Sequence, residues 1–286
     1  MSRFHQSVSW TQSQNQNNQQ EPRENETNRK KKSNHIQSLT ADEDTESFDL
    51  KNARATLRCP QTFFVPVHYE SNYRYPLIVW LHSDGFNENQ IDHVMPHIST
   101  RNYLATGVRG TRAADSVGHR FDWHNSDTAI DAACEKVLCG IDEAIDRYAV
   151  HTDRVILAGY RSGGTTAMRI AMRNPSRFAG VASFGGRMPK GGRAFANLDE
   201  IRKRQLPMLW QWGKDNPLYQ QDSLAADIRD AQVLKAKLEI RQYNNEDEMN
   251  TAALSDFNQW IMNRIVAGVS MDAESWETTP VCFSEN

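Results

Sequence analysis

The sequence has 286 residues, of which 38% are hydrophobic and 24% charged, and its formal net charge at pH 7 is -3. This composition is enough to bury one sizeable core, and the small negative charge excludes a general attraction to nucleic acid. No apolar run is long enough to cross a bilayer, and the N-terminus lacks the apolar core of a signal peptide. We therefore expect no membrane span and a cytoplasmic location.

Polar segments are predicted to flank a single folded domain. Residues 1–47 are rich in Gln, Asn and charged side chains, and they contain too few apolar residues to offset chain entropy, so we expect a disordered tail. The basic run at 29–32 would let this tail contact a protein partner, although a solvated charge run is the ordinary explanation. Residues 48–268 are expected to form the folded domain, and residues 269–286 a C-terminal tail.

Apolar strands alternate with amphipathic helices between the two tails. We expect strands at 63–69, 77–81, 103–108, 155–158, 180–184, 208–212 and 238–243, and helices at 128–148, 222–234 and 251–266. This alternation predicts an α/β fold with a mostly parallel central sheet and helices on both of its faces. Because ligands of such sheets bind beyond the carboxyl ends of the strands, the turns after Leu81, Ala158 and Trp212 are the candidate site.

The most informative of these turns follows Ala158. There an apolar strand enters a glycine-flanked bend and then a helix, which is the context of the G-x-S-x-G nucleophile elbow. With this segment, the chain resembles the phospholipase/carboxylesterase branch of the α/β-hydrolases, which includes acyl-protein thioesterases. The motifs that carry the resemblance are Tyr75–Gly85, Arg154–Ala167, Trp212–Pro217 and Tyr243–Trp260. The resemblance covers about residues 50–266 and implies an α/β-hydrolase fold and an ancestry in carboxylic-ester hydrolysis.

The resemblance also assigns the three catalytic positions, and each of them holds an unexpected side chain. Arg161 stands in place of the nucleophile, Asn216 in place of the acid and Asp247 in place of the histidine. A guanidinium has no lone pair with which to attack a carbonyl. In the family the histidine comes last along the chain, but the last of the nine histidines here is His151. We therefore predict an esterase-like hydrolase that has lost ester hydrolysis.

A remodelled cleft is expected around these positions. Its predicted lining is His82, Ser83, Asp84, Arg161, Ser162, Asn216, Asp247 and Glu248. We expect a charge-assisted contact between Arg161 and Asp247 or Glu248, with Asn216 nearby, which would close the cleft. Asp84 follows the strand where the family forms its oxyanion hole, and it would repel a developing oxyanion if it pointed inward.

One alternative is an active carboxylesterase that uses Ser162. A register slip of one residue would make Ser162 the nucleophile, and its base would then have to be His82, His119 or His124. A second alternative is a binding protein, in which Arg161 at the start of a helix holds a small anionic or acyl ligand. The hydrolase domain could also serve as a platform for a protein partner.

Two further features have ordinary structural explanations. Aromatic side chains near the expected site would either line an open pocket or pack in the core, and we favour the core; they are Trp123, Trp210, Trp212 and Tyr219. His93 and His97 lie four residues apart on an expected helix, but no Cys or acidic partner is obviously placed to complete a metal site with them. We therefore predict no metal site and no cofactor.

Overall fold

The computed structural model describes residues 60–214, 216, 221–244 and 249–268. Both expected tails lie outside these ranges, so their boundaries and the protein partner proposed for the N-terminal tail stay predictions. Tyr219, Asp247 and Glu248 lie outside them as well. None of the helices within the described ranges is long and apolar enough to cross a membrane.

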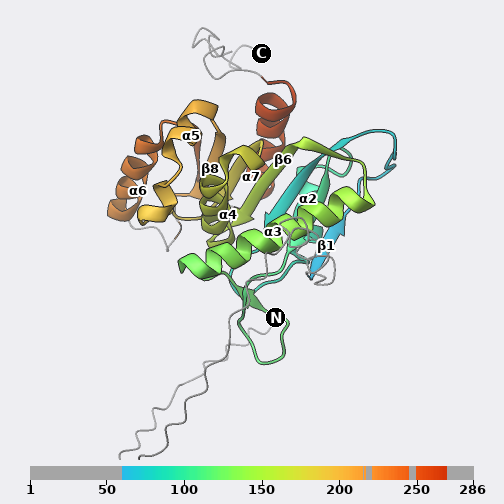
Figure 1. Ribbon diagram of the computed structural model, residues 1–286, viewed down its shortest axis with the longest axis horizontal. Helices are drawn as coiled ribbons and strands as arrows, with labels where there is room; N and C mark the ends of the chain where they lie inside the picture. Colours follow the sequence, from blue (N-terminus) through green and yellow to red (C-terminus); the bar gives the residue numbers. More distant parts are fainter. Residues whose placement is uncertain (1–59, 215, 217–220, 245–248, 269–286) are drawn as a thin grey trace, which may run out of the picture. The chain divides into compact units, whose positions relative to one another are not determined.

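Figure 1 shows the central sheet between its helices. Among the described residues this sheet has seven strands, in the order β1-β3-β2-β6-β7-β8-β9. Their bounds are β1 Gln61–Phe64, β2 Tyr75–Leu81, β3 Leu104–Val108, β6 Val150–Tyr160, β7 Gly180–Phe184, β8 Pro207–Gly213 and β9 Lys237–Tyr243. Only β1 is antiparallel to its neighbour, and the other adjacent pairs within this sheet are parallel. The predicted α/β architecture with a mostly parallel sheet is confirmed.

The first strand differs from the expected one, and a small ribbon was not expected. The strand predicted at 63–69 instead ends at Phe64, two residues before Pro66, which has no N–H to donate to a ladder. The loop after β3 contains a two-stranded antiparallel ribbon, β4 (Arg112–Ala113) and β5 (Phe121–Asp122). Strands of two residues are too short to show an alternation in the sequence.

Helices cover both faces of the sheet. The α-helices are α2 Gln90–Ile98, α3 Asp127–Arg147, α4 Ser162–Arg173, α5 Leu198–Arg204, α6 Gln221–Leu234 and α7 Thr251–Trp260. Apolar side chains of α3, α4, α5 and α6 join the buried cluster on one face, and those of α2 and α7 join the cluster on the other. The helix expected at 251–266 is α-helical to Trp260 and continues as a π-helix, η3, over Ile261–Val266.

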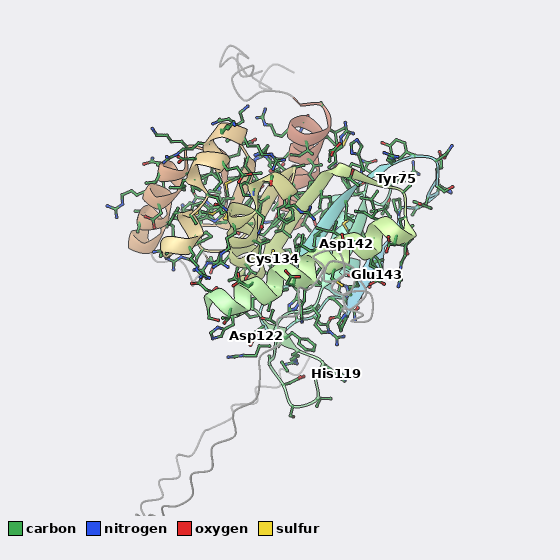
Figure 2. All side chains as sticks on the ribbon, in the orientation of Figure 1. Tyr75, His119, Asp122, Cys134, Asp142 and Glu143 are labelled. Carbon is green, nitrogen blue, oxygen red and sulfur yellow. The ribbon has the colours of Figure 1, made fainter. Side chains whose placement is uncertain are left out.

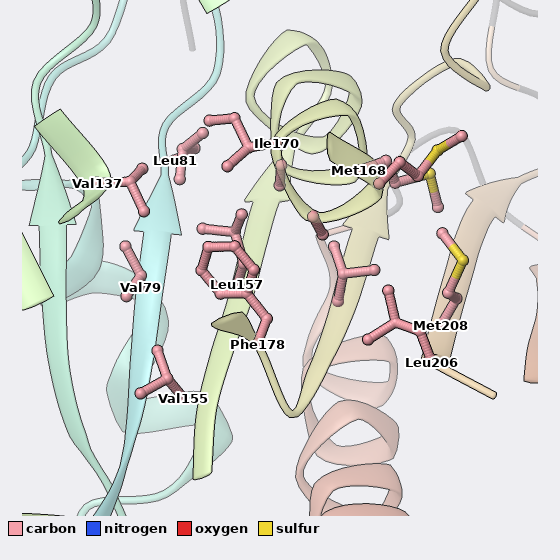
Figure 3. Close-up of a cluster of buried hydrophobic side chains, with 14 of the residues drawn as sticks. Val79, Leu81, Val137, Val155, Leu157, Met168, Ile170, Phe178, Leu206 and Met208 are labelled. Carbon is pink, nitrogen blue, oxygen red and sulfur yellow. The ribbon is translucent and has the colours of Figure 1, made fainter. Parts of the chain in front are cut away.

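The strand β2 shows why the sheet needs two helical layers. All seven of its residues are buried, and successive side chains point to opposite faces of a strand. Val79 and Leu81 pack in the α3/α4 cluster (Figure 3), whereas Ile78 and Trp80 pack in the α2/α7 cluster. A continuous apolar strand is therefore stable only with apolar helices on both sides, as its sequence predicts.

The aromatic residues near the expected site are packing residues. Trp210 is fully buried, and its indole N–H donates to the carbonyl of Gly186 at 2.8 Å. Trp212 is buried as well, and the rings of Trp210 and Trp212 stack with their centroids 6.1 Å apart. Trp123 is also buried. These three side chains thus belong to the core, as expected, rather than to the wall of an open pocket.

Candidate functional site

The elbow between β6 and α4 places Arg161 at its apex. Strand β6 ends at Tyr160 and helix α4 begins at Ser162, so Arg161 is the single residue in the bend. Its φ of 51° and ψ of -116° lie in a region that residues with a side chain rarely adopt. Its N–H donates to the carbonyl of Phe184 at 2.7 Å, and its carbonyl accepts from the N–H of Thr165 at 3.0 Å. The neighbouring strand and the first turn of the helix therefore hold the bend.

Glycines allow the helix to start directly against the sheet. A Cβ added to Gly163 would lie 2.2 Å from the carbonyl oxygen of Leu81 and 2.3 Å from that of His82. A Cβ added to Gly159 would lie 2.6 Å from the carbonyl carbon of Gly163. Such separations are impossible for real side chains, so these positions require glycine. The turn has the close packing that its two flanking glycines predict.

The side chain of Arg161 rests on the aromatic ring before it. Its guanidinium carbon lies 4.9 Å from the centroid of the Tyr160 ring, which is a cation–π contact. The Nε of Arg161 is buried and has no hydrogen-bond partner among the described residues. The expected contact with Asp247 or Glu248 involves residues outside the described ranges and stays a prediction.

Ser162 begins the helix and does not occupy the apex. Its Oγ is buried and forms no hydrogen bond within the described part of the chain. His119 and His124 are exposed, and the Nδ1 of His124 accepts a hydrogen bond from the N–H of Ser126 at 3.3 Å. Among the described residues, neither histidine contacts the hydroxyl that it would have to activate.

His82 is committed to a structural role at the end of β2. It is fully buried, its Nδ1 lies 2.7 Å from the carbonyl oxygen of Ser83, and its Nε2 accepts from the N–H of Gly110 at 2.9 Å. Only a neutral ring with its proton on Nδ1 satisfies both contacts. Burial lowers the pKa of His82, although the bond to Ser83 opposes this shift. His82 therefore ties β2 to the loop after β3, and both of its ring nitrogens are occupied.

The loop after β2 is held by side chains that the sequence motifs did not reveal. The N–H of Ser83 donates to the Oε1 of Gln90 at 3.2 Å, and the Nε2 of Gln90 donates to the Oγ of Ser83, also at 3.2 Å. The N–H of Gly85 donates to the Oδ1 of Asp122 at 2.8 Å. Two backbone donors of the loop after β2 thus already have partners. Asp84 is exposed, so its carboxylate does not point into the protein.

The parallel strands bring the predicted positions to one edge of the sheet. Leu81 at the end of β2 pairs with Gly159 in β6, which places His82 beside the elbow. Asn216 follows β8 at the same edge, where it is buried and its N–H donates to the carbonyl of Gly213 at 3.4 Å. The described positions of the site therefore share the carboxyl edge, as expected for a parallel sheet.

A charged cluster beside the elbow was not anticipated. Asp227 of α6 is fully buried and accepts hydrogen bonds from the Nε of Arg187 at 2.6 Å and from the N–H of Met188 at 3.2 Å. The Nζ of Lys190 lies 3.1 Å from the same carboxylate. Burial alone would raise the pKa of Asp227, but the bonds from Arg187 and Lys190 lower it below its usual range. The N–H of Arg187 donates to the Oγ1 of Thr165 at 2.8 Å, which joins this cluster to the elbow helix.

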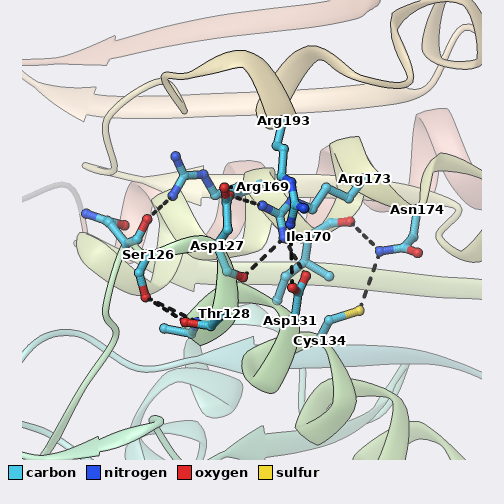
Figure 4. Close-up of polar contacts among 12 residues, drawn as sticks. Ser126, Asp127, Thr128, Asp131, Cys134, Arg169, Ile170, Arg173, Asn174 and Arg193 are labelled. Atoms are coloured by element: carbon cyan, nitrogen blue, oxygen red, sulfur yellow. Dashed lines mark hydrogen bonds and ion pairs between the residues drawn. The ribbon is translucent and has the colours of Figure 1, made fainter.

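The second half of α4 is anchored to α3. Arg173 forms ion pairs with Asp127 and Asp131, and its bond to the Oδ1 of Asp131 measures 2.7 Å (Figure 4). Arg169 donates to the carbonyls of Asn125 at 2.5 Å and of Lys190 at 2.6 Å. These contacts fix the helix behind the elbow and so fix the direction in which its N-terminus points.

His93 and His97 lie on α2 (Gln90–Ile98), and neither belongs to a group of possible metal ligands among the described residues. The His93 ring packs edge-on against Phe86, with the centroids 6.4 Å apart, and His97 is exposed. Within the ranges that the structure describes, no three His, Cys, Asp or Glu side chains are grouped as a metal ion requires. Among the described residues, no disulfide joins Cys134 and Cys139.

Solved structures share this architecture. The carboxylesterase of Bacillus cereus superposes with a TM-score of 0.57 at 13% identity, over 73% of this chain and 96% of that one. The chain has an α/β-hydrolase fold. FphF of Staphylococcus aureus, a fluorophosphonate-binding serine hydrolase, superposes with a TM-score of 0.54 at 14% identity, over 72% of this chain and 92% of that one. The resemblance inferred from the sequence motifs is thereby confirmed at the level of the α/β-hydrolase fold.

Similarity in sequence is confined to a shorter stretch. NocK of Nocardia uniformis subsp. tsuyamanensis, which is named as an esterase, is 32% identical to this chain over 95 residues. These residues make up 33% of this chain and 26% of NocK. The chain thus matches about a quarter of the length of this curated relative. No protein-family model matches the sequence.

Proposed function

We propose that this chain is an esterase-like α/β-hydrolase that no longer hydrolyses carboxylic esters. The observation that carries the proposal is the arginine at the apex of the elbow. Serine hydrolases need a hydroxyl at this point and an imidazole to take its proton. A guanidinium neither attacks a carbonyl nor accepts a proton. No histidine follows His151 in the sequence, so the usual base has no candidate in the C-terminal part.

The contacts around the elbow support the same proposal. Both ring nitrogens of His82 are used in a neutral imidazole, so it does not offer a free base to Ser162. The amides of Ser83 and Gly85 already donate to Gln90 and Asp122. An oxyanion formed near them would have to displace these side chains.

A combined activity and labelling assay tests the loss of hydrolysis. The purified full chain is incubated with short-chain p-nitrophenyl esters and, separately, with a fluorophosphonate probe. We expect no turnover above the background of the buffer and no covalent label, because no activated serine is present. Ser162→Ala is the matched control and is expected to behave like the wild type. Labelling that disappears in Ser162→Ala would instead establish the alternative in which Ser162 is the nucleophile.

A second candidate function is the binding of a small anionic ligand at the remodelled cleft. One observation favours it: the buried Nε of Arg161 has no partner among the described residues. The guanidinium also stands at the N-terminus of α4, where the helix dipole favours negative charge. An arginine fork binds carboxylate or phosphate in two-point fashion. Asp247 and Glu248 are the competing intramolecular partners.

Titration with acetate and with inorganic phosphate separates these possibilities. If a ligand site exists, Arg161→Gln should weaken binding about tenfold or more, and Arg161→Lys should weaken it less. If Asp247 and Glu248 neutralise Arg161, the wild type should bind poorly, and the double variant Asp247→Asn, Glu248→Gln should bind more tightly. Binding of either anion that is unchanged in Arg161→Gln would contradict the ligand function.

A further inference from the structure

The strand β9 leaves one edge of the central sheet open. It is the last strand in the sheet order, and within the described residues it pairs only with β8. Its seven residues include no proline, and none of them is buried. The strand at the opposite edge, β1, has four residues and lies between Pro60 and Pro66, which have no N–H to donate. Of these two edges, β9 therefore offers the longer template for pairing with another strand.

The backbone of β9 presents alternate residues to this open edge. In a strand, the N–H and C=O of one residue point to one side and those of the next residue to the other. The carbonyl of Tyr243 accepts from the N–H of Lys214 at 2.8 Å, on the side of β8. Residues 238, 240 and 242 therefore face away from β8. The outward N–H of Leu238 donates to the carbonyl of Ala236, but over the described ranges the outward groups of residues 240 and 242 have no hydrogen-bond partner.

The side chains of β9 are complementary to a second copy of the same strand that runs antiparallel to it. With Ile240 opposite its own counterpart on a two-fold axis, Glu239 of each copy stands opposite Arg241 of the other. Ile240 is 42% exposed, and the two isoleucines would cover each other. An axis at residue 239 would oppose two carboxylates, and an axis at residue 241 would oppose two guanidiniums. Like charges directly opposite each other are destabilising, so the sequence favours the pairing centred on Ile240.

The charged side chains of β9 are already ordered within one copy. The Nε of Arg264 donates to the Oε1 of Glu239 at 2.7 Å, and Arg241 lies 3.3 Å from the same carboxylate. An incoming strand would add its own guanidinium to this row without having to order the carboxylate first. Because Glu239 is packed in this way, the exposed Ile240 is the better position at which to test the pairing.

We propose that β9 pairs antiparallel with β9 of a second copy, centred on Ile240, so that the two sheets join in a homodimer. The two Ile240 residues exchange their backbone hydrogen bonds, and the N–H of each Gln242 donates to the carbonyl of Leu238 in the other copy. An interface built on two strands is small, so the association is weak and depends on concentration. In the sheet, β7 and β8 separate β9 from β6, the strand that leads to the elbow.

Analytical ultracentrifugation of the full chain over a range of concentrations tests the proposal. We expect a reversible equilibrium between monomer and dimer. Ile240→Lys and Ile240→Asp should each weaken dimerisation about tenfold or more, because each puts two like charges opposite each other on the axis. An equimolar mixture of these two variants should dimerise again, since opposite charges then meet. This recovery also shows that both variants are folded.

Val117→Lys is the control for an added charge, and it should leave dimerisation unchanged. Val117 is 70% exposed and lies in the loop after β3, across the sheet from β9; Figure 2 labels His119 on the same loop. Hydrogen exchange at the amides of Ile240 and Gln242 should slow as the dimer forms. The proposal is overturned if the full chain stays monomeric, which would leave the edge free or covered by the chain itself. It is also overturned if both Ile240 variants still dimerise alone, or if their mixture does not.

Discussion

The histidine at the end of β2 shows how burial can turn a titratable residue into a structural one. His82 donates and accepts as a neutral ring inside the protein, and burial lowers its pKa. An unfolded chain takes up a proton at this residue near pH 6.5, whereas the folded chain resists it. Below that pH the unfolded state therefore binds more protons, and stability falls as the pH falls.

Urea unfolding at pH 7 and at pH 5.5 should show this effect. We expect the wild type to lose stability between the two values. His82→Gln should be less stable at pH 7, by about 1–2 kcal/mol, because its amide replaces two ring contacts imperfectly. Its stability should depend less on pH, since nothing titrates at this position. His93 is exposed, and His93→Gln should keep the wild-type dependence. An unchanged pH dependence in His82→Gln would contradict the assignment of a neutral buried ring.

At the scale of elements, the start of α4 depends on how closely it approaches β2. Gly163 is helical, and helix propensity alone predicts that alanine would be more stable there by about 1 kcal/mol. The two carbonyl oxygens that a Cβ would meet belong to the backbone of the β2 end, which cannot rotate away. Steric crowding should therefore outweigh propensity and reverse the sign of the effect.

The substitution Gly163→Ala is expected to destabilise the protein by about 2 kcal/mol or more, measured by chemical denaturation. Gly118→Ala is a useful comparison because its Cβ would meet nothing within 4 Å, although its φ is 78°. That variant should lose only about 1 kcal/mol, through backbone strain. If Gly163→Ala were as stable as the wild type, the conclusion that α4 packs too closely on β2 to admit a side chain at position 163 would be wrong.

The elements that could be predicted from the sequence are those whose signal is local. The apolar run of β2 and the helical period of α3 each lie within one short window, and the elbow is marked by its glycines. The contacts around the site are of another kind. Gln90 and Asp122 reach the loop after β2 from 7 and 37 residues away, and Arg187 meets Asp227 across 40 residues. No motif or period encodes such pairs, so they became visible only in the folded chain.

At the scale of the whole molecule, the parallel sheet separates two regions with different chemistry. Its carboxyl edge holds the elbow, the buried His82 and the cluster around Asp227, where partners already occupy many polar groups. Its amino edge holds the packed rings of Tyr69, Tyr73 and Tyr75. Because β2, β3 and β7 are buried along their whole length, a change at one edge should reach the other only through the core.

At Arg161 the chain keeps a side chain where glycine would relieve the backbone. Holding such a residue at φ 51° and ψ -116° costs on the order of 1–3 kcal/mol. A working serine hydrolase must accept that cost, since glycine has no nucleophile to present. A hydrolase that has lost its activity could carry glycine at this bend, and relieving backbone strain in this way is among the simplest routes to a more stable protein. The stability of the folded protein thus gives no reason to keep arginine at this bend. We infer that Arg161 is kept for an interaction of its side chain.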